Sequence, residues 1–395
     1  MSLKVALLRN SQGFENLSMK YYAHQLAHGL EEIGIEALEI AEPRSLQMGR
    51  VSRLCKKAEG YFTRYWRYPQ SLSSIRADLY HIIDHANSHW LRVLPPERTV
   101  VTCHDLMLLK LAAGEIPWVG HRPRIAHIAF RWSAGYLRQA GAVVCVSECT
   151  KQDAARLLGC SSNRLYVVHQ GIHEAFGQVF DPDIRANARK RFGFTWPITL
   201  LHVGHNLFYK NLEGIIEALA LLPAKWRHRI HLVKAGEDFT TAQWNLVRRR
   251  GVGDRVHSLG QLSLQDLVLL YNVADVLIFP SLYEGFGWPP LESMACGTPV
   301  VCSDRGSLGE VVGDAACLVN PEDSGDIMRG AIRVCEDEPY RQELVRRGLE
   351  RAKRFRWDRA AQQFRFIYHA LLYGKTEAGH GSGDGITPEE TLRPV

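Results

Sequence analysis

The segment VLIFPSLYEGFGWPPLESMACGTPVVCSD, residues 276–304, decides the fold class because it places two buried strands around a short helix. Val276–Phe279 and Pro299–Cys302 are apolar at consecutive positions, which is typical of parallel strands covered on both faces. Between them, Gly285 and Gly287 allow a tight loop, and two adjacent prolines suit the first turn of a helix. The segment therefore predicts a strand–helix–strand unit of a parallel α/β sheet.

The same alternation of apolar runs and helical patterns continues along the chain. The predicted strands are Val5–Leu8, Ile35–Ile40, Leu79–Ile83, Val100–Cys103, Ala142–Val146, Leu165–Val168, Ile198–Val203, His231–Ala235, Val256–Leu259, Val276–Phe279, Pro299–Cys302 and Ala316–Val319. Helical patterns lie between them, for example at Met19–Ile33 and Leu264–Asn272. Because the alternation runs twice, we expect two doubly wound α/β domains, residues 1–172 and 198–356, joined by a turn-rich linker at 173–197. The polar, glycine-rich tail 374–395 is expected to be disordered.

Composition indicates a globular protein, with 395 residues and 46% hydrophobic side chains, enough for two cores. We find no apolar run near the ~20 residues that cross a bilayer, and the first residues predict a strand rather than a signal peptide. The nine cysteines are scattered without metal-binding spacing, which favours a reducing compartment. The expected location is therefore the cytoplasm.

The net charge of +6 is unevenly distributed. Residues 1–172 hold 21 Lys and Arg against 14 Asp and Glu, whereas the remainder holds 27 against 28. Much of the excess lies in residues 44–67, where basic residues alternate with Tyr61, Phe62, Tyr65 and Trp66. Such a segment is typical of a peripheral contact with an anionic membrane surface, here its inner face, although a solvated basic face over packed aromatic rings has the same pattern. No nucleic-acid-binding motif accompanies it.

A lysine occupies the end of the strand predicted at Ile198–Val203. Ligands of open α/β sheets bind beyond the carboxyl ends of the strands. Lys210 lies there, within GHNLFYKNLEG, directly before a predicted helix whose free N–H groups favour a phosphate. We interpret Lys210 as a partner for a diphosphate, against the alternative of an ordinary surface lysine.

Two carboxylates, Glu284 and Glu292, follow the strand Val276–Phe279. Their closeness fits the acid/base pair of a glycoside hydrolase, and it also fits a clamp that holds a ligand. We expect Glu284 on the loop and Glu292 in the first turn of the next helix, where the helix dipole favours a carboxylate. A carboxylate in that position of a dinucleotide-binding-like unit suits a nucleotide ligand, which favours the ligand clamp over the hydrolase pair.

Residues 279–304 resemble the signature of glycosyltransferase family 4, retaining enzymes of the GT-B fold in which two glutamates flank an EGFGxPxLE-type loop. HVGHNLFYKNLEG resembles the donor-phosphate loop of that family, VVCVSECTKQDAARLLG and VVHQGI its interdomain passage, and FRWDRAAQQF the helix that crosses back to the first domain. The resemblance covers nearly the whole chain, except the tail and residues 41–75. It implies two Rossmann-like domains facing a central cleft, an acceptor-binding first domain completed by a helix at about 357–373, and a second domain that binds a nucleotide-sugar.

The resemblance also assigns roles to single residues. The implied donor-binding residues are Gly204, His205, Asn206, Lys210, Glu284, Gly285, Phe286, Gly287 and Glu292. Glu292 would bond the ribose hydroxyls, Glu284 the transferred sugar, and Lys210 the diphosphate. On the acceptor side, His104 and Asp105 match an HDL turn from which His104 would reach the donor sugar. Gly13 would approach the diphosphate or the acceptor.

The implied reaction moves a hexosyl unit to a glycan, lipid-linked or small-molecule acceptor with retention of configuration. The departing phosphate oxygen takes the acceptor proton, so Lys210, Glu284 and His104 act by positioning and charge stabilisation. No cofactor or metal is expected for this reaction. The chain departs from the family at Tyr209 and His205, where an arginine is frequent, so the second phosphate-binding cation is missing.

Two other functions are compatible with parts of the pattern. One is a two-domain sugar-binding protein without catalysis, and the other is a different GT-B enzyme such as a nucleotide-sugar epimerase, in which the two glutamates are not expected at this spacing. His81, His85 and His89 would form a metal-binding face only on one helix, and His81 falls in a predicted strand instead.

Overall fold

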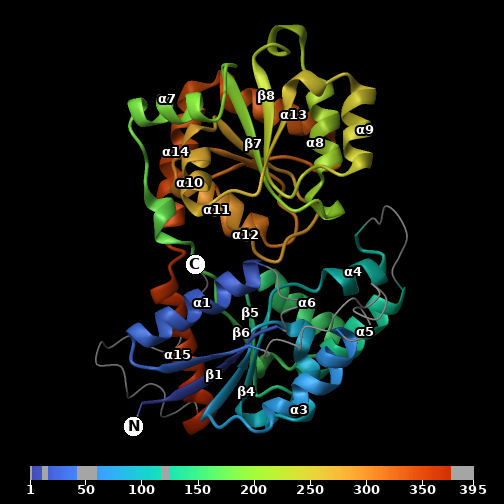
Figure 1. Cartoon of the computed structure of the whole chain (residues 1–395), viewed down its shortest axis with the longest axis vertical. Helices are drawn as coiled ribbons and strands as arrows, with labels where there is room; N and C mark the ends of the chain where they lie inside the picture. Colours follow the sequence, from blue (N-terminus) through green and yellow to red (C-terminus); the bar gives the residue numbers. More distant parts are fainter. Residues whose placement is uncertain (1, 11–16, 42–59, 117–123, 375–395) are drawn as a thin grey trace, which may run out of the picture. The chain divides into compact units, whose positions relative to one another are not determined.

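The computed structural model describes residues 2–10, 17–41, 60–116 and 124–374. The chain forms two compact units (Figure 1). Unit 1 comprises Met1–Glu115, His121–Gly171 and Arg356–Val395, and unit 2 comprises Ile116–Gly120 and Ile172–Phe355. The chain therefore returns to unit 1 at its last helix.

Unit 1 is built on a six-stranded parallel sheet. Its strands are β1 (Lys4–Leu8), β2 (Glu36–Ile40), β3 (Leu79–Ile82), β4 (Thr99–Cys103), β5 (Ala142–Cys145) and β6 (Leu165–Val167), in the order β2-β1-β3-β4-β5-β6. The winding reverses between β1 and β3, so the loops after these two strands diverge. Such a switch point opens a ligand site at the carboxyl edge of a sheet.

Unit 2 repeats this architecture with a second six-stranded parallel sheet. Its strands are β7 (Ile198–Gly204), β8 (Ile230–Gly236), β9 (Val256–Gly260), β10 (Val276–Phe279), β11 (Val300–Cys302) and β12 (Cys317–Leu318), in the order β12-β11-β10-β7-β8-β9. The switch point lies between β7 and β10. The prediction of two doubly wound α/β units is confirmed, and each predicted strand is present within two residues of its expected bounds.

Helices connect the strands and cover both faces of each sheet (Figure 1). In unit 1 they are α1 (Leu17–Glu32), η1 (Thr63–Arg67), α3 (Tyr68–Leu72), η2 (His85–Arg92), η3 (Pro96–Arg98), α4 (Met107–Ala113), α5 (Arg124–Ala134), η4 (Gly135–Gln139), α6 (Glu148–Leu158), η5 (Ser162–Arg164) and α15 (Trp357–Tyr373). In unit 2 they are η6 (Glu174–Gly177), α7 (Pro182–Arg191), η7 (Phe208–Lys210), α8 (Leu212–Ala220), η8 (Ala224–Trp226), α9 (Thr241–Arg250), η9 (Gly253–Arg255), α10 (Leu264–Val273), α11 (Trp288–Ala295), α12 (Leu308–Val312), α13 (Ser324–Glu336) and α14 (Glu338–Ala352).

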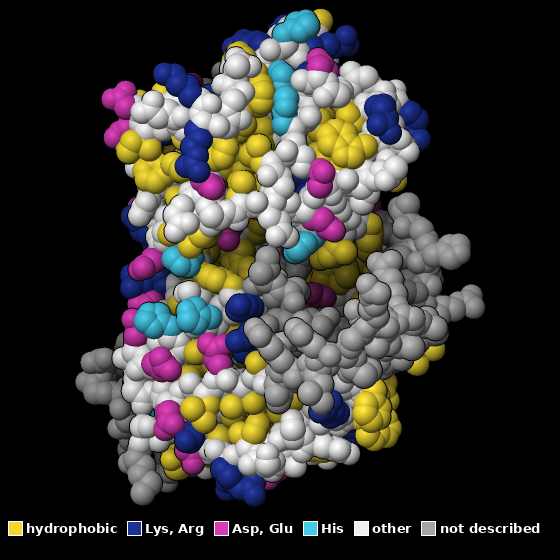
Figure 2. Space-filling view, viewed as in Figure 1, with side chains coloured by type: hydrophobic (Ala, Val, Ile, Leu, Met, Phe, Trp, Pro, Cys, Tyr) yellow, Lys and Arg dark blue, Asp and Glu magenta, His cyan; other side chains and the backbone are white. Residues whose placement is uncertain are grey.

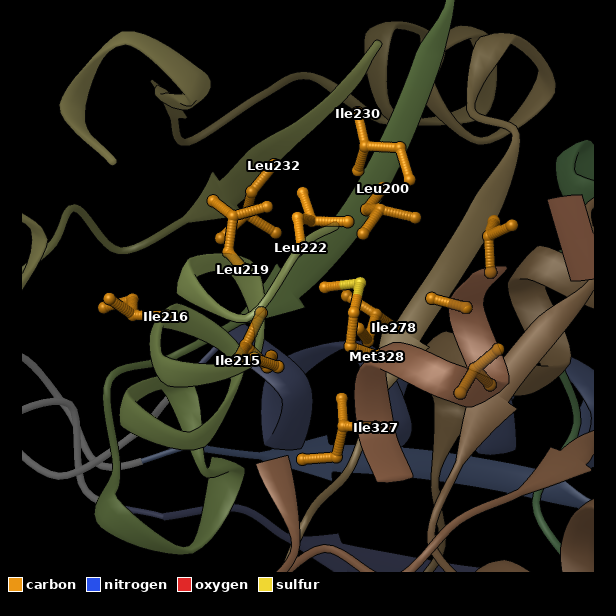
Figure 3. Packing of buried hydrophobic residues seen from close by; sticks show 14 of the residues in the cluster. Leu200, Ile215, Ile216, Leu219, Leu222, Ile230, Leu232, Ile278, Ile327 and Met328 are labelled. Atoms are coloured by element: carbon orange, nitrogen blue, oxygen red, sulfur yellow. The ribbon is translucent and has the colours of Figure 1, made fainter. Parts of the chain in front are cut away.

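Each sheet buries its own apolar core. In unit 2, side chains of α8 and α13 pack against the face of β7, β8 and β10, as Figure 3 shows for Leu219, Leu232 and Ile278. These three residues have no exposed surface. Fully burying such a side chain stabilises the fold by about 1.5–3 kcal/mol, so this packing fixes the strand ends that carry the polar loops.

The helix α15 packs within unit 1 against α1. A side chain at Gly29 would place its Cβ 3.2 Å from Ala361 Cβ and 3.3 Å from the Trp357 carbonyl, so the two helices approach closely. Tyr22 of α1 packs edge-on against the Trp357 ring at 5.5 Å. The helix α15 begins at Trp357, 190 residues after β6 ends at Val167. Its apolar face would otherwise be exposed, and this packing buries it.

Some local expectations hold and others need correction. Ser263 caps α10 by accepting from the Asp266 amide, and Pro289 lies in the first turn of α11, as expected. Glu292, however, is the fifth residue of α11 and not in its first turn, because the helix begins already at Trp288. Residues 173–197, expected to be a linker, hold the helices η6 and α7 and belong to unit 2.

Within the described ranges, no helix combines the length and apolar character that crossing a bilayer requires. The eight cysteines of those ranges are free thiols, and six of them are buried. Buried thiols of this kind act as small apolar side chains in the cores. The tail beyond Gly374 lies outside the described residues.

Candidate functional site

The loop after β7 brings Lys210 to the switch point of unit 2. Residues 205–210 leave the carboxyl end of β7 and close through η7, and α8 begins at Leu212. Asn211 adopts a left-handed conformation with φ of 57° at this junction, which asparagine tolerates better than most residues. Lys210 therefore directly precedes the N-terminus of α8, as predicted.

The loop after β10 brings Glu284 to the same place. β10 and β7 are hydrogen-bonded neighbours, with Val276 beside Leu200 and Leu277 beside Leu201. The loops that leave them are joined by a backbone bond from the Leu282 amide to the Tyr209 carbonyl at 2.7 Å. The sheet register therefore makes the two predicted residues neighbours although they are 74 positions apart.

Lys210 and Glu284 form an ion pair at this edge. Lys210 Nζ donates to Glu284 Oε1 at 2.7 Å, and the side chains are only 12% and 9% exposed. The ammonium also lies 4.9 Å from the centre of the Phe279 ring, which favours a cation. An ammonium has three donors, so it can hold Glu284 and still donate to an anion. The pair thus offers a cation and an acceptor side by side.

Ser307 and Gly306 hold the Glu284 loop from behind. The Ser307 hydroxyl donates to the Phe286 carbonyl at 2.6 Å, and its amide donates to the Glu284 carbonyl at 3.1 Å. Gly306 has a φ of 63°, and a Cβ there would lie 2.4 Å from the Glu284 carbonyl oxygen. Sequence reasoning missed both residues; the small-residue run after the strand Val300–Cys302 was the available signal. The loop is therefore fixed by contacts that only a small residue permits.

The glycines predicted in this loop differ in their roles. Gly287 has a φ of 120° and directly precedes α11, so it needs the conformational freedom that was expected. Gly285 does not adopt a positive φ. Phe286 is buried and packs edge-on at 5.8 Å from the Phe355 ring, so its side chain anchors the loop.

A fully buried lysine lies beneath the predicted phosphate loop. Lys234, near the end of β8, has no exposed surface and donates to the Gly204 carbonyl at 3.1 Å and to the Glu237 carbonyl. Burial lowers the pKa of Lys234 to about 8, although the nearby Glu237 and Asp238 oppose this shift. Sequence reasoning missed Lys234 because its apolar neighbours predicted an ordinary strand. The structure therefore places a second cation next to the loop in which an arginine is absent.

The rest of this loop is tied to the loop after β8. The Asn206 amide donates to Glu237 Oε2 at 3.0 Å, and His205 Nδ1 lies 3.8 Å from the same oxygen. A Cβ on Gly236 would lie 2.6 Å from the Gly204 carbonyl oxygen, so these two glycines let the strand ends approach. Gly204, His205 and Asn206 thus occupy the edge that the sequence assigned to a donor.

Glu292 faces a different environment from Glu284. Its Oε2 accepts from the Tyr271 hydroxyl at 2.7 Å. Burial raises the pKa of Glu292 to about 7, and the bond from Tyr271 opposes this shift only in part. The carboxyl therefore gains its charge at a higher pH than an exposed glutamate, and it accepts hydrogen bonds best when ionised.

In unit 1, His104 and Asp105 follow β4, as predicted. Both ring nitrogens of His104 are engaged: Nε2 donates to the Ile83 carbonyl at 2.7 Å, and Nδ1 lies 3.0 Å from Gln170 Nε2. Because a carbonyl only accepts, the neutral ring carries its proton on Nε2. Burial lowers the pKa of His104, although the carboxylate of Asp84 opposes this. Asp105 accepts from the Met107 amide at the start of α4.

A polar network that sequence reasoning missed lies at the switch point of unit 1. Asn10, two residues after β1, donates to Asp84 Oδ2 at 2.6 Å and accepts from Asn87 at 2.6 Å. Desolvation raises the pKa of Asp84, but His85, His104 and the hydrogen bonds from the Ala86 amide and Asn10 together hold it below its usual value. His85 Nε2 is buried and has no hydrogen-bond partner among the residues that the structure describes. Gly13, predicted for this edge, lies outside the described residues.

Two of the three histidines spaced four apart, His81 and His89, bond to side chains of the core. His81 bonds Tyr368 and Thr102, each at 2.7 Å, and His89 bonds Ser133 at 2.8 Å. No group of three or more His, Cys, Asp or Glu able to hold a metal ion occurs among the residues that the structure describes. These histidines therefore serve the core of unit 1.

Family models match both units. Residues 184–351 match the model described as glycosyl transferases group 1, and residues 19–176 match that of glycosyltransferase family 4. The first range contains Lys210, Glu284 and Glu292, and the second contains His104.

Individual proteins extend this similarity. O-antigen chain mannosyltransferase B of Escherichia coli is 31% identical over 282 residues, which are 70% of this chain and 71% of that protein. The serotype-specific mannosyltransferase WbdA of Escherichia coli is 27% identical over 80% of this chain, which spans only 40% of its length. Sucrose-phosphate synthase from Thermosynechococcus elongatus has the same fold, with a TM-score of 0.75 over 94% of this chain and 99% of that one at 22% identity.

Proposed function

The chain belongs to the family 4 glycosyltransferases of the GT-B fold, and from this premise we propose that it moves a hexosyl unit with retention of configuration. Its substrates would be a nucleotide-sugar donor and a glycan or lipid-linked acceptor. The observation that carries this proposal is the Lys210–Glu284 pair at the β7/β10 switch point. A hydrolase of two carboxylates has no need of a lysine there, whereas a donor with a diphosphate and a sugar needs both charges.

The proposed donor pose follows from the loops of unit 2. The diphosphate lies against the turn Gly204–Asn206 and the N-terminus of α8, where free amides and Lys210 stabilise its charge. Glu284 accepts from hydroxyls of the transferred sugar, and Glu292 accepts from the ribose. The backbone amides of Phe286 and Gly287 complete the contact with the sugar or phosphate.

The proposed chemistry needs no protein base at the anomeric carbon. As the bond to the leaving phosphate weakens, negative charge grows on that oxygen, and Lys210 stabilises it. The same oxygen takes the proton of the acceptor hydroxyl, which attacks from the face that the phosphate leaves. We propose that this charge stabilisation replaces a metal ion, so chelation should leave the rate unchanged.

Mannose is the first sugar to test, because two relatives are named as mannosyltransferases. A thermal-shift screen with GDP-mannose, UDP-glucose and ADP-glucose identifies the donor, because a ligand that binds only the native state raises the unfolding temperature. Release of nucleoside diphosphate with an acceptor then measures transfer. Binding without release would favour the sugar-binding alternative, and a new nucleotide-sugar without acceptor would favour the epimerase.

Peripheral membrane association through residues 44–67 is a separate proposal. Residues 44–59 lie outside the described residues, so the structure describes only the last eight positions of this segment, 60–67. Those positions form η1 and the three helical residues before it.

A further inference from the structure

We propose that one flank of unit 1 is a docking surface for an anionic lipid bilayer, built jointly by η1 and α5. This inference names the surface and the partner for the membrane association proposed above, and it rests on no step of sugar transfer. The aromatic–arginine surface comprises Tyr61, Phe62, Trp66, Arg67, Arg92, Ile128, Arg131 and Trp132. Its α5 members lie outside the segment that the sequence singled out.

Large apolar side chains are exposed on this surface. Phe62 is 61% exposed, Trp66 58%, Ile128 70% and Trp132 42%. Figure 2 shows exposed hydrophobic side chains on this flank of unit 1, in the region where Figure 1 draws α3 and α5. Single exposed apolar residues are common, but a cluster of aromatic rings from two helices marks an interaction site.

The rings are held in place by hydrogen bonds beneath them. Arg92 lies between the two elements, with its guanidinium carbon 5.9 Å from the Trp66 ring and 5.0 Å from the Trp132 ring. It donates to the Tyr65 carbonyl at 3.0 Å and to the His89 carbonyl at 3.1 Å. The Tyr65 ring packs at 6.0 Å from that of Trp132. The surface is therefore a preorganised platform, which lowers the entropic cost of binding.

A π-helical turn contributes to the same surface. η1 interrupts the helical stretch between Gly60 and Leu72, and both of its flanking residues are helical. Such a turn is rare and is frequent at functional sites. Here it accompanies the stacking of Tyr61 on Tyr65, whose centroids are 6.2 Å apart.

The charges identify the partner as an anionic surface. Residues 60–72, 85–94 and 124–140 contain no Asp or Glu. The same ranges contain six arginines: Arg64, Arg67, Arg92, Arg124, Arg131 and Arg138. Arg67, Arg92 and Arg131 are exposed. Tryptophan and tyrosine rings favour the headgroup level of a bilayer, and each arginine near an anionic surface adds attraction. A layer of anionic headgroups can accommodate the aromatic rings and bind the arginines at the same depth. The partner is therefore a bilayer rather than a protein.

The test is sedimentation of the full chain with vesicles of equal parts phosphatidylglycerol and phosphatidylcholine. The wild-type chain is expected to sediment with them at low salt, to leave them at high salt, and to ignore vesicles of phosphatidylcholine alone. The double variant Arg67→Glu, Arg131→Glu should bind about tenfold more weakly or worse. The double variant Trp66→Ser, Trp132→Ser should lose binding while keeping the charge.

The matched control is Arg249→Glu with Arg354→Glu, two exposed arginines of unit 2, which makes the same change of charge. If the control variant lost binding to the same extent, the aromatic–arginine surface would not be the docking site, and binding would depend only on net charge. Absence of wild-type sedimentation, or self-association of the wild type that the tryptophan variant abolishes, would overturn the bilayer as partner. Vesicle binding is measured without a nucleotide-sugar donor. Its result therefore stays interpretable even if the transferase proposal fails.

Discussion

Lys210 Nζ lies 2.7 Å from Glu284 Oε1, and this contact joins the two loops that leave the neighbouring strands β7 and β10. Each residue alone is unremarkable in the sequence. Together, nearly buried and at a switch point, they place opposite charges where a nucleotide-sugar would present its phosphate and its hydroxyls.

Replacing Lys210 by Met should lower kcat by about 10²–10³, since a donor aimed at developing charge contributes on that scale. The measurement is release of nucleoside diphosphate at saturating donor. The control is Lys225→Met, which removes an exposed ion pair of 2.6 Å with Glu336 in the same unit and should leave the rate unchanged. Near-wild-type turnover in the Lys210 variant would remove this residue from the site.

Donor affinity should depend on the ionisation of Glu292. Because burial raises the pKa of Glu292 to about 7, the accepting carboxylate predominates only above that pH, and donor KM should fall as pH rises through 7. In Glu292→Gln this pH dependence should disappear and KM should be high throughout. A wild-type profile retained in the variant would assign the titration to another group.

The same carboxyl makes a prediction for stability. A carboxyl whose folded pKa is raised favours the native state when protonated, and that contribution is lost as pH rises from its unfolded value of about 4.5 to about 7. Glu292→Gln should therefore gain thermal stability relative to wild type above pH 7 and show no such gain at pH 4. Differential scanning calorimetry at both pH values measures this, with the exposed Glu336→Gln as control. An equal difference at both pH values would contradict the assignment.

Lys234 is predicted to be a positioning residue for the phosphate loop. Lys234→Met keeps most of the volume but removes the bonds to the Gly204 and Glu237 carbonyls, which should cost about 1–3 kcal/mol of stability and raise donor KM more than it lowers kcat. The exposed Lys353→Met should change neither quantity. A loss of stability with unchanged KM would make Lys234 a core residue only.

Gly306→Ala should displace the Glu284 loop. The new Cβ would lie 2.4 Å from the Glu284 carbonyl oxygen and would also strain a φ of 63°. Donor affinity should fall although no side chain of the site is changed. Gly251→Ala is the control, because Gly251 has the same φ of 63° but a Cβ there would meet no atom of the described residues within 4 Å. If both variants bound the donor with equal affinity, the Glu284 loop would not be part of the donor site.

The sequence allowed much of the fold to be predicted because its strands are apolar on consecutive positions. Val276–Phe279 is an example. Both faces of this strand are buried, so its sequence is apolar throughout and does not alternate between apolar and polar residues. The meeting of Lys210 and Glu284 was predicted only as two strand-end residues, since their distance depends on the order β10-β7 in the sheet.

Other parts of the site were beyond reach of the sequence. Lys234 lies inside an apolar strand, and only the three-dimensional structure shows that its ammonium meets two carbonyls beneath the loop. Glu292 was expected in the first turn of α11 and lies just beyond it, because Trp288 extends the helix by one residue before its two prolines. The surface shared by η1 and α5 joins segments about 60 residues apart, and no local pattern links them.

The central claim is that the edge of the second sheet holds a nucleotide-sugar for transfer with retention, and NMR of the products tests it most directly. The wild-type chain, given its donor, an acceptor and a chelator, should yield nucleoside diphosphate and a glycoside whose anomeric configuration equals that of the donor. The Lys210→Met variant should yield neither at a comparable rate. An inverted glycoside, free sugar in place of a glycoside, or equal yield from the variant would contradict the claim.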